Sequence, residues 1–291
     1  MGTHELASAV SNAGGLGIIG AGHYDPAWLQ QQIDRTREAT DKPFGVNLAL
    51  TSTFLEGVIG VILKEKVPVV SLGAGDPSGL IPRFKDAGIK VMPVVSSVSM
   101  ARRSEAVGAD LVVAEGMESG GRIGETATMA LVPQVVDSVN IPVIAAGGIA
   151  DGRGLAAALA LGALGVQMGT RFVCSTECIA HAAYKQRIVE ADDVATMVTR
   201  HTLRLPLRTL RNKLSEQFAE LEKAGVPKDA LELFDRDRMY LGLISGDLEE
   251  GSLLAGQIAG LIDDVRPARE IIERIVAQAE AAIRDVYGMT Q

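Results

Sequence analysis

The sequence predicts an α/β fold of the TIM (β/α)8-barrel type, because short apolar runs alternate along the chain with amphipathic helical stretches. Each run is almost continuously apolar, which is typical of a parallel strand buried on both faces of its sheet. No hairpin signal joins two of the runs, so the connections must be helical and the sheet parallel. The predicted strands are Gly15–Gly20, Phe44–Leu48, Val67–Leu72, Lys90–Val95, Asp110–Glu115, Ile141–Ala145 and Gly165–Thr170.

The composition agrees with this fold. The chain has 291 residues, which suits one large α/β domain with an appendage. Hydrophobic residues make up 47% of the chain but aromatic residues only 4%, and there are 32 glycines. Such small side chains allow helices to pack closely on a buried parallel sheet.

The segments between the strands carry helical signals. Amphipathic stretches run over Pro26–Ala39 and Val98–Val107. Gly88 and Gly108 each follow a helical segment just before the next strand, which is common at helix C-termini. These signals support repeated strand–helix units.

The number of predicted strands is one short of a closed barrel. Seven runs are present, whereas a closed barrel of this type has eight. The chain opens with Met1–Glu5 and a helical stretch over Leu6–Asn12, so the barrel is expected to lack its first strand. Two unpaired sheet edges would result.

The pattern changes after the last predicted strand. Ile179–Ala191 is helical, and the charged region that follows lacks the strand–helix rhythm. We predict a barrel over residues 1–191, a helical lid subdomain over 192–250 and closing helices of the barrel over 251–291. The closing helices are expected at Gly251–Asp263 and Pro267–Tyr287.

Charge and cysteine content exclude several classes of protein. The net charge of −8 and the pI of about 5.1 argue against a nucleic-acid partner, which requires a basic surface. Cys174 and Cys178 have neither CxxC spacing nor a nearby histidine pair, so we expect reduced thiols and no metal. No apolar run reaches the roughly 18–20 residues of a membrane span, and no signal peptide is evident. We expect a cytoplasmic protein without a membrane partner.

The late strand ends carry the strongest binding signal. In (β/α) barrels ligands bind at the carboxyl ends of the strands. The turn Ala145–Gly148 follows one late strand, and Gly169 and Thr170 end the last. Glycines leave backbone N–H groups open to an anion, so these turns predict a phosphate site. The alternative, that the glycines only make tight turns, is less favoured because two adjacent strands carry them.

Earlier strand ends offer polar groups. Asn47 ends one strand, where its amide either bonds a ring edge or makes a turn. Gly73–Asp76 follows another strand. The loop Glu115–Gly124 contains four glycines and no apolar face, which favours binding over packing. Glu115 is therefore a candidate cofactor contact, with a solvated acid as the alternative.

The histidines do not mark a catalytic site. None of His4, His23, His181 and His201 lies at a late strand end, so the usual acid–base catalyst is missing there. We expect these side chains at the surface or in packing. A redox cofactor that carries the hydride itself would make such a histidine dispensable.

Six segments together resemble one known family. They are AEGMESGGRIGETATMALVPQV, IPVIAAGGIADGRG, GVQMGTRFV, GSLLAGQIAGL, AVSNAGGLGIIGAG and KPFGVNL. In combination they resemble the FMN-dependent enoyl-ACP reductase II family, within the nitronate monooxygenase (2-nitropropane dioxygenase)-like group. The resemblance runs from about Leu6 to about Ile275.

The resemblance implies a flavoprotein with FMN at the C-terminal mouth of the barrel and NAD(P)H as electron donor. Reduced flavin would pass hydride to the β-carbon of a trans-2-enoyl thioester on acyl carrier protein, in fatty-acid elongation. A homodimer is also expected. The implied flavin contacts are Asn47, Gly73, Glu115, Gly120, Gly121, Ala146, Gly147, Gly148, Met168, Gly169 and Thr170, and the implied substrate or lid residues are Gln257 and Arg208.

Two features depart from the family. Its Gly-Gly-His-Ile-Gly segment has Arg122 at the histidine position. That histidine is the general base in nitronate oxidation and faces substrate or cofactor in the reductase. Arginine stays protonated near neutral pH and cannot be the base, although a fixed cation can polarise a thioester carbonyl or bind a pyrophosphate. Arg122 is therefore the candidate catalytic residue. The second departure is the first strand, whose Gln-Gly-Gly-Met-like end touches FMN in the family.

Three functions stay open. The reductase is favoured by the basic strip Arg200–Lys213, which could steer an acidic carrier protein or be an ordinary solvated helix face. An FMN- and oxygen-dependent nitronate monooxygenase is the alternative, against which Arg122 argues. An inactive flavin-binding homologue is favoured by Arg122 and by the absent strand.

Overall fold

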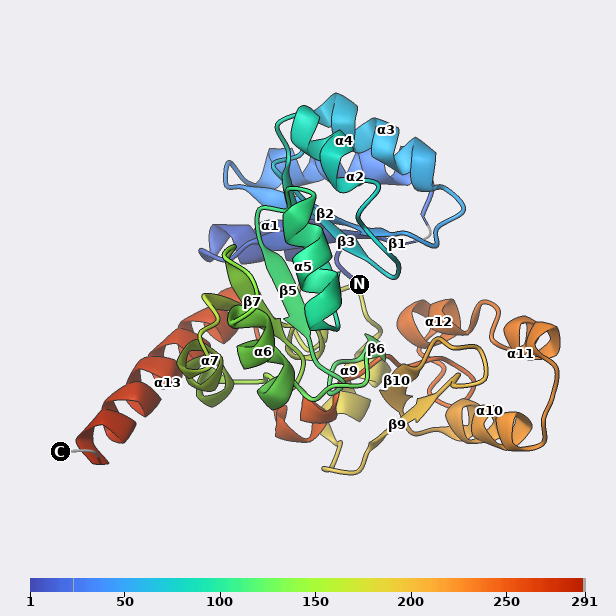
Figure 1. Ribbon diagram of the computed structural model, residues 1–291. Helices are drawn as coiled ribbons and strands as arrows, with labels where there is room; N and C mark the ends of the chain where they lie inside the picture. Colours follow the sequence, from blue (N-terminus) through green and yellow to red (C-terminus); the bar gives the residue numbers. More distant parts are fainter. Residues whose placement is uncertain (23, 290–291) are drawn as a thin grey trace.

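The structure is a computed structural model that describes residues 1–22 and 24–289. Its centre is a curled parallel sheet in which each strand pairs with its neighbours in chain order (Figure 1). This arrangement confirms the predicted TIM-type α/β fold. The strands are β1 Gly17–Gly22, β2 Phe44–Ala49, β3 Val69–Gly73, β4 Lys90–Val95, β5 Val112–Glu115, β7 Val143–Ala146 and β8 Gly165–Gln167.

Helices cover the outside of this sheet and connect its strands. The first long connection, α2, begins at Pro26 after Asp25, whose carboxylate accepts from the Trp28 amide. Gly88 and Gly108 have positive φ values of 75° and 97°, as the helix C-terminal turns require. The helices are α1 His4–Asn12, α2 Pro26–Ala39, α3 Leu55–Glu65, α4 Ile81–Asp86, α5 Val98–Ala106, α6 Thr128–Val136 and α7 Gly152–Ala160.

The sheet is open between its first and last strands. Among the described residues, β1 pairs only with β2, and β8 only with β7. The N-terminal residues lie along the free edge of β1, where the Gly20 amide donates to the Gly2 carbonyl at 2.8 Å. The structure therefore has the predicted strand count and an unclosed barrel.

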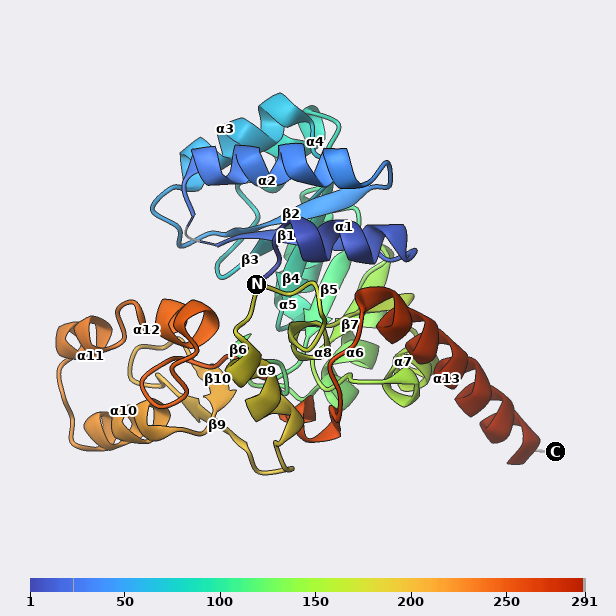
Figure 2. The same cartoon turned by 180° about the vertical axis from the view of Figure 1, so that it is seen from behind.

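A small antiparallel sheet lies beside the barrel. It is formed by β6 Gly121–Arg122, β10 Leu207–Leu210 and β9 Thr196–Thr199, in that order. Beyond it, α10 Lys213–Lys223, α11 Lys228–Phe234 and α12 Arg238–Tyr240 lie in the region predicted as a lid, to one side of the main sheet (Figure 2).

The sequence pattern of the lid predicted helices alone, and the two strands differ from that expectation. Spaced arginines suggested a helix face, but Thr196–Thr199 and Leu207–Leu210 pair with each other over all four residues. β-Branched residues such as Thr196, Val198 and Thr209 favour this pairing. The pattern of charged residues in this region therefore gave no sign of the antiparallel strand pair β9–β10.

The C-terminal region forms one long helix instead of the two closing helices that the sequence predicted. Gly251–Asp263 is mostly irregular and holds the short 3-10 helix η2, Gln257–Leu261, where a helix was expected. Its glycines lie against other backbone segments: a Cβ on Gly256 would lie 2.7 Å from the Glu118 carbonyl oxygen. Helix α13, Ala268–Met289, packs against α7 and α1, and its C-terminal end projects from the body (Figure 2). In the part of the chain that the structure describes, no helix has the length and apolarity needed to span a bilayer.

Candidate functional site

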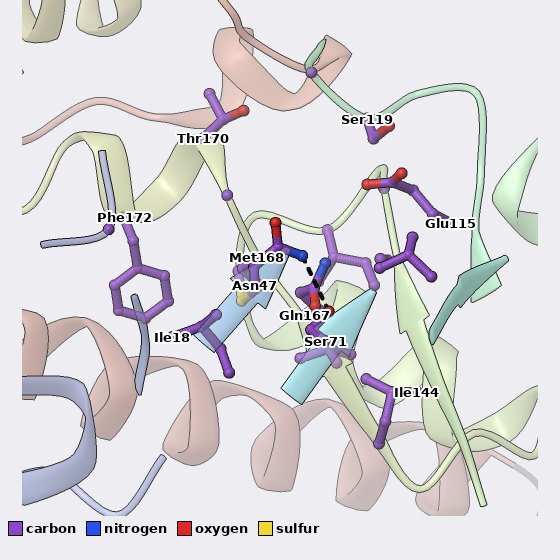
Figure 3. Close-up of a pocket in the computed structure, with 18 of the residues that line it drawn as sticks. Ile18, Asn47, Ser71, Glu115, Ser119, Ile144, Gln167, Met168, Thr170 and Phe172 are labelled. Atoms are coloured by element: carbon purple, nitrogen blue, oxygen red, sulfur yellow. Dashed lines mark hydrogen bonds between the residues drawn. The ribbon is translucent and has the colours of Figure 1, made fainter. Parts of the chain in front are cut away.

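A cavity of about 910 Å³ runs from the carboxyl ends of the main strands into the barrel interior. Its volume is in the range of small-molecule and cofactor sites. Figure 3 shows its wall, to which the early strands contribute Asn47 and Ser71 and the late strands Gln167 and Met168. The predicted site residues that line it are Asn47, Gly73, Glu115, Gly120, Arg122, Ala146, Gly147, Gly148, Met168, Gly169 and Thr170.

The glycine turns, which we define as Gly147, Gly148 and Gly169, form one part of the wall. Gly147 and Gly148 have φ values of 87° and 70°, a region that favours glycine. A Cβ on Gly147 would lie 2.8 Å from the Gly116 carbonyl oxygen, whereas a Cβ on Gly169 would meet nothing within 4 Å. The backbone N–H groups of Gly148 and Gly169 donate to no described residue. These turns can therefore accept an anionic group through their backbone.

A hydrogen-bonded pair behind the turns holds them in place. The Thr128 hydroxyl donates to the Gly147 carbonyl at 3.1 Å and lies 2.9 Å from Glu118 Oε2. The Glu118 carboxylate also accepts from the Thr128 amide, at the start of α6. Because α6 follows the Glu115–Gly124 loop, this pair ties that loop to the glycine turns. The sequence prediction missed both residues.

A polar pair on neighbouring strands lies in the middle of the cavity wall. Asn47 Nδ2 donates to Ser71 Oγ at 3.2 Å, the dashed line in Figure 3. The two residues are paired in the register of β2 and β3. The side-chain oxygen Oδ1 of Asn47 is left available to accept a hydrogen bond from a ligand. Ser71 was missed, although a hydroxyl within the apolar run Val67–Leu72 was a usable signal.

The charged wall, which we define as Glu115, Ser119 and Arg122, forms another part of the cavity. Glu115 ends β5 and faces Ser119 across the loop (Figure 3). Burial raises the pKa of Glu115 to about 7, and the Ser119 hydroxyl opposes part of this rise. Close to neutral pH the Glu115 carboxyl therefore holds a proton about half of the time and can donate a hydrogen bond.

Arg122 brings a fixed positive charge to the same wall. It lies in β6, paired with Leu207 of β10, and follows Gly121, whose φ is 82°. Its guanidinium is half-buried and makes no hydrogen bond or ion pair to a described residue. Burial lowers the pKa of Arg122, yet an arginine remains charged in proteins. Gly121 itself lies behind the cavity wall.

Two predicted substrate residues lie elsewhere. The Gln257 side chain is exposed outside the cavity, while its amide donates to the Glu118 carbonyl at 2.9 Å. Arg208 is 4% exposed and donates through Nη2 to the Met117 carbonyl at 3.0 Å. Arg208 thus fastens the Glu115–Gly124 loop to the small sheet.

The expected basic strip is not a continuous surface. Arg200 and Arg208 are both buried, and Arg200 forms an ion pair with Asp235. Lys213 pairs with Glu250 at 2.5 Å. Only Arg204 and Arg211 of the five basic residues are exposed without a partner closer than 3.8 Å. The predicted face fails because Leu207–Leu210 form strand β10, in which Arg208 is buried, and because Arg200 turns inward to pair with Asp235.

The described histidines lie away from the cavity, as the sequence predicts. His4 is in α1 beside Gln32 and Glu5, and His181 caps α9, Ala182–Val189. His201 is exposed in a turn, and His23 lies outside the described residues. None of the three described histidines lines the cavity, and its titratable side chains are those of Glu115, Glu118, Lys90, Arg122 and Cys178.

The wall fits a flavin mononucleotide in three respects. Free backbone N–H groups in the glycine turns suit a phosphate, and the Asn47 and Glu115 side chains suit the polar edge of a ring or ribityl chain. Apolar residues beside them, such as Ile18 and Met168, can cover a ring face. Which of these residues touches FMN stays a prediction.

Comparison with known proteins agrees with this arrangement. The nitronate monooxygenase family matches residues 1–56 and 49–278. The solved structure of FabK from Thermotoga maritima is 50% identical, covers 99% of this chain and 92% of its own, and superposes with a TM-score of 0.97. Two curated relatives match over nearly the whole chain as well.

The first relative is the (3aS,4S,5R,7aS)-5-hydroxy-7a-methyl-1-oxo-octahydro-1H-indene-4-carboxyl-CoA dehydrogenase of Mycobacterium tuberculosis. It is 36% identical over 99% of this chain and 92% of its own. The second is a probable nitronate monooxygenase of Staphylococcus saprophyticus, 34% identical over 95% of this chain and 91% of its own. The chain thus belongs to the nitronate monooxygenase family of FMN-type oxidoreductases.

Proposed function

We propose that this chain reduces trans-2-enoyl thioesters carried on acyl carrier protein, with FMN as cofactor and NAD(P)H as electron donor. The proposal depends on one observation: Arg122 places a permanent positive charge on the cavity wall. At this position nitronate oxidation needs a base, whereas enoyl reduction needs a group that polarises the thioester. The 50% identity to FabK, an enoyl-ACP reductase II, supports the same reaction. So does the relative that acts on a CoA thioester.

The chain's own residues would hold the reactants. Bound FMN would supply hydride chemistry, accepting hydride from NAD(P)H and delivering it to the β-carbon. The glycine turns would hold the cofactor phosphate, and Asn47 and Glu115 would hydrogen-bond its polar edge. Arg122 would stabilise negative charge on the thioester oxygen as the β-carbon gains hydride. Solvent would supply the proton that the α-carbon gains.

The decisive experiment uses the FMN-loaded protein and crotonyl-acyl carrier protein. We expect anaerobic NAD(P)H oxidation with formation of the saturated butyryl thioester in equal amount. Arg122→Gln should lower kcat by about 10–100-fold, since a charge-stabilising donor is lost. Arg236→Gln, an exposed lid arginine, is the matched control. Absence of turnover by a fully flavin-loaded sample would refute the proposal.

Nitronate monooxygenation is the second candidate, because a relative and the family carry that name. It predicts oxygen-dependent consumption of an alkyl nitronate without NAD(P)H. Arg122 cannot be its base, so we expect no such activity in the natural chain and its appearance in Arg122→His. Nitronate turnover by the natural chain would favour this function instead.

An absorbance spectrum, together with the two assays, distinguishes an inactive flavin-binding homologue from the reductase and from the monooxygenase. A purified protein with flavin absorbance bands near about 370 and 450 nm but no turnover in either assay would be such a homologue. Without these bands after reconstitution, the FMN site itself would be refuted.

A further inference from the structure

A second, smaller cavity of about 230 Å³ adjoins the main one. Arg122 lines both cavities, so its guanidinium lies at their junction. The loops after β2 and β3 contribute Thr51, Ala74 and Gly75, and the turn before β10 contributes Arg204. No acidic side chain of the described residues lines this cavity. It can therefore receive part of a molecule whose remainder occupies the main cavity.

The two arginines of this cavity have no internal counter-ion. Neither Arg122 nor Arg204 makes a side-chain hydrogen bond or ion pair to a described residue. Elsewhere in the lid Arg200 pairs with Asp235 and Arg238 with Glu250. Arg204 is exposed, but Arg122 is half-buried, and an unpaired charge that is partly removed from water costs free energy. Burial lowers the pKa of Arg122 accordingly. An external anion would remove this cost.

The fold holds both arginines toward the same space. Arg122 is fixed in β6 by pairing with Leu207, and Arg204 precedes β10 by three residues. Arg204 has a φ of 55°, which is uncommon for a residue other than glycine and is maintained here by the turn from His201. In the loop after β3, the Asp76 carboxylate accepts hydrogen bonds from the Ser78 amide and hydroxyl. The small sheet thus presents two cations beside the main cavity.

The size of the cavity limits the ligand. Complete small-molecule sites are commonly about 300–1,000 Å³, so 230 Å³ suits one group of a larger molecule. Guanidinium groups bind phosphate oxygens with paired N–H donors, and the Thr51 hydroxyl can add another. A phosphate ester fits this chemistry.

We propose that the arginines of this cavity bind a phosphate ester of the substrate or donor whose reacting end lies in the main cavity. The inference rests on the proposed reductase function. Two sources share this chemistry. The 5′-phosphate of the nicotinamide donor would contact both Arg122 and Arg204 before the thioester enters. The phosphopantetheine phosphate of the thioester would contact Arg204, since Arg122 then faces the thioester oxygen.

The test compares matched pairs of reactants that differ by one phosphate. Crotonyl-phosphopantetheine and crotonyl-N-acetylcysteamine form the thioester pair. Reduced nicotinamide mononucleotide and reduced nicotinamide riboside form the donor pair. In one pair the natural enzyme should prefer the phosphorylated member through a lower KM. In the donor pair we expect Arg122→Gln to reduce that preference about tenfold and Arg204→Asn about threefold. In the thioester pair we expect Arg204→Asn to reduce it about threefold and Arg122→Gln to lower kcat for both members alike. Asparagine tolerates the positive φ of Arg204.

If the variants lose the phosphate preference in the thioester pair, the site binds the phosphopantetheine arm. If they lose it in the donor pair, the site binds the nicotinamide nucleotide. Arg236→Gln should change neither. Calorimetry with phosphopantetheine and with reduced nicotinamide mononucleotide, on FMN-loaded protein, measures binding without turnover. If turnover is absent but binding depends on Arg204, the reductase proposal fails and the phosphate site stands. Equal binding by natural and variant proteins, with no phosphate preference in either pair, would overturn the site.

Discussion

The glycine turns and the charged wall border the same cavity but are built from different parts of the chain. The turns act through backbone atoms, whose positions follow from the φ values of Gly147 and Gly148. The charged wall acts through side chains, whose ionisation depends on burial: Glu115 has a pKa of about 7 and Arg122 is unpaired. The two meet at the ends of the parallel strands β5 and β7, where Glu115 pairs in register with Ala146, whereas Arg122 comes from the small antiparallel sheet.

This difference separates binding from reaction. Where a Cβ would collide with neighbouring atoms, only glycine fits, so a site built from backbone groups keeps the same ligand geometry. Such a site can bind the same cofactor even when the reaction differs. A side-chain site can change its chemistry by one substitution while the fold stays intact. Arg122 in place of the family's histidine is such a change. We therefore expect substitutions in the glycine turns to affect FMN binding and stability, and those in the charged wall to affect pH dependence and reaction.

The largest effect is expected from Gly147→Ala. The new Cβ would lie 2.8 Å from the Gly116 carbonyl oxygen, at a φ of 87°. We expect the free energy of unfolding to fall by about 1–3 kcal/mol and FMN affinity to fall about 100-fold, as phosphate-facing amides shift. Urea unfolding and FMN fluorescence titration measure the two quantities.

A matched control is Gly60→Ala, at an exposed position of α3 where a Cβ would meet nothing within 4 Å. Removing a glycine from a helix interior should raise stability by about 0.5–1 kcal/mol and leave FMN affinity unchanged. If Gly147→Ala behaved like this control, the turn would have no special backbone role.

Gly169→Ala should separate cofactor binding from stability. Its φ is −104°, and the new Cβ would point into space where no protein atom lies within 4 Å. We expect unchanged unfolding of the FMN-free protein, but about a tenfold lower FMN affinity because a methyl group would crowd a charge-assisted hydrogen bond. Undiminished FMN affinity would place the phosphate away from Gly169.

The main sheet could be predicted because each buried parallel strand is a separate apolar run. Runs such as Val67–Leu72 and Ile141–Ala145 locate β3 and β7 to within about two residues, the usual precision of such boundaries. The β9–β10 ribbon could not be predicted in the same way. Its strands are only four residues long, their burial does not alternate, and β10 carries Arg208 among apolar residues, so no strand pattern is visible. Arg200 and Arg208 are buried only because partners distant in sequence accept their hydrogen bonds.

The cavity wall was predictable where backbone conformation requires glycine or where a polar residue ends a strand, as at Gly147 and Asn47. Thr128 and Glu118 were not, since their roles depend on a contact between α6 and the Glu115–Gly124 loop. Likewise, only the three-dimensional structure brings Arg204 beside Arg122.

The charged wall should give the next effect in size, through Glu115→Gln. The folded-state pKa of about 7 exceeds the ordinary value of 4.5, so protonation of Glu115 favours the folded state. That contribution is complete below pH 4.5 and is lost as the pH rises through 7. Relative to the natural chain, the glutamine variant should gain about 2–3 kcal/mol between pH 4.5 and pH 8.

Urea unfolding of both FMN-free proteins at the two pH values measures this gain. Glu38→Gln removes the same charge from an exposed position of α2 and controls for net charge. A constant stability difference between natural and Glu115→Gln proteins across this range would mean that Glu115 is solvated like an ordinary surface carboxylate.

The smallest effect is expected where the two parts of the wall are joined, at Thr128→Val. Valine keeps the shape of threonine but removes the hydroxyl that bonds Glu118 and the Gly147 carbonyl. Thr128→Ser retains the hydroxyl and serves as the control. We expect valine to lower stability by about 1 kcal/mol and FMN affinity about threefold, because the turn loses one fastening bond. If stability fell without any change in FMN affinity, Thr128 would only cap α6, and the charged wall and glycine turns would be energetically independent.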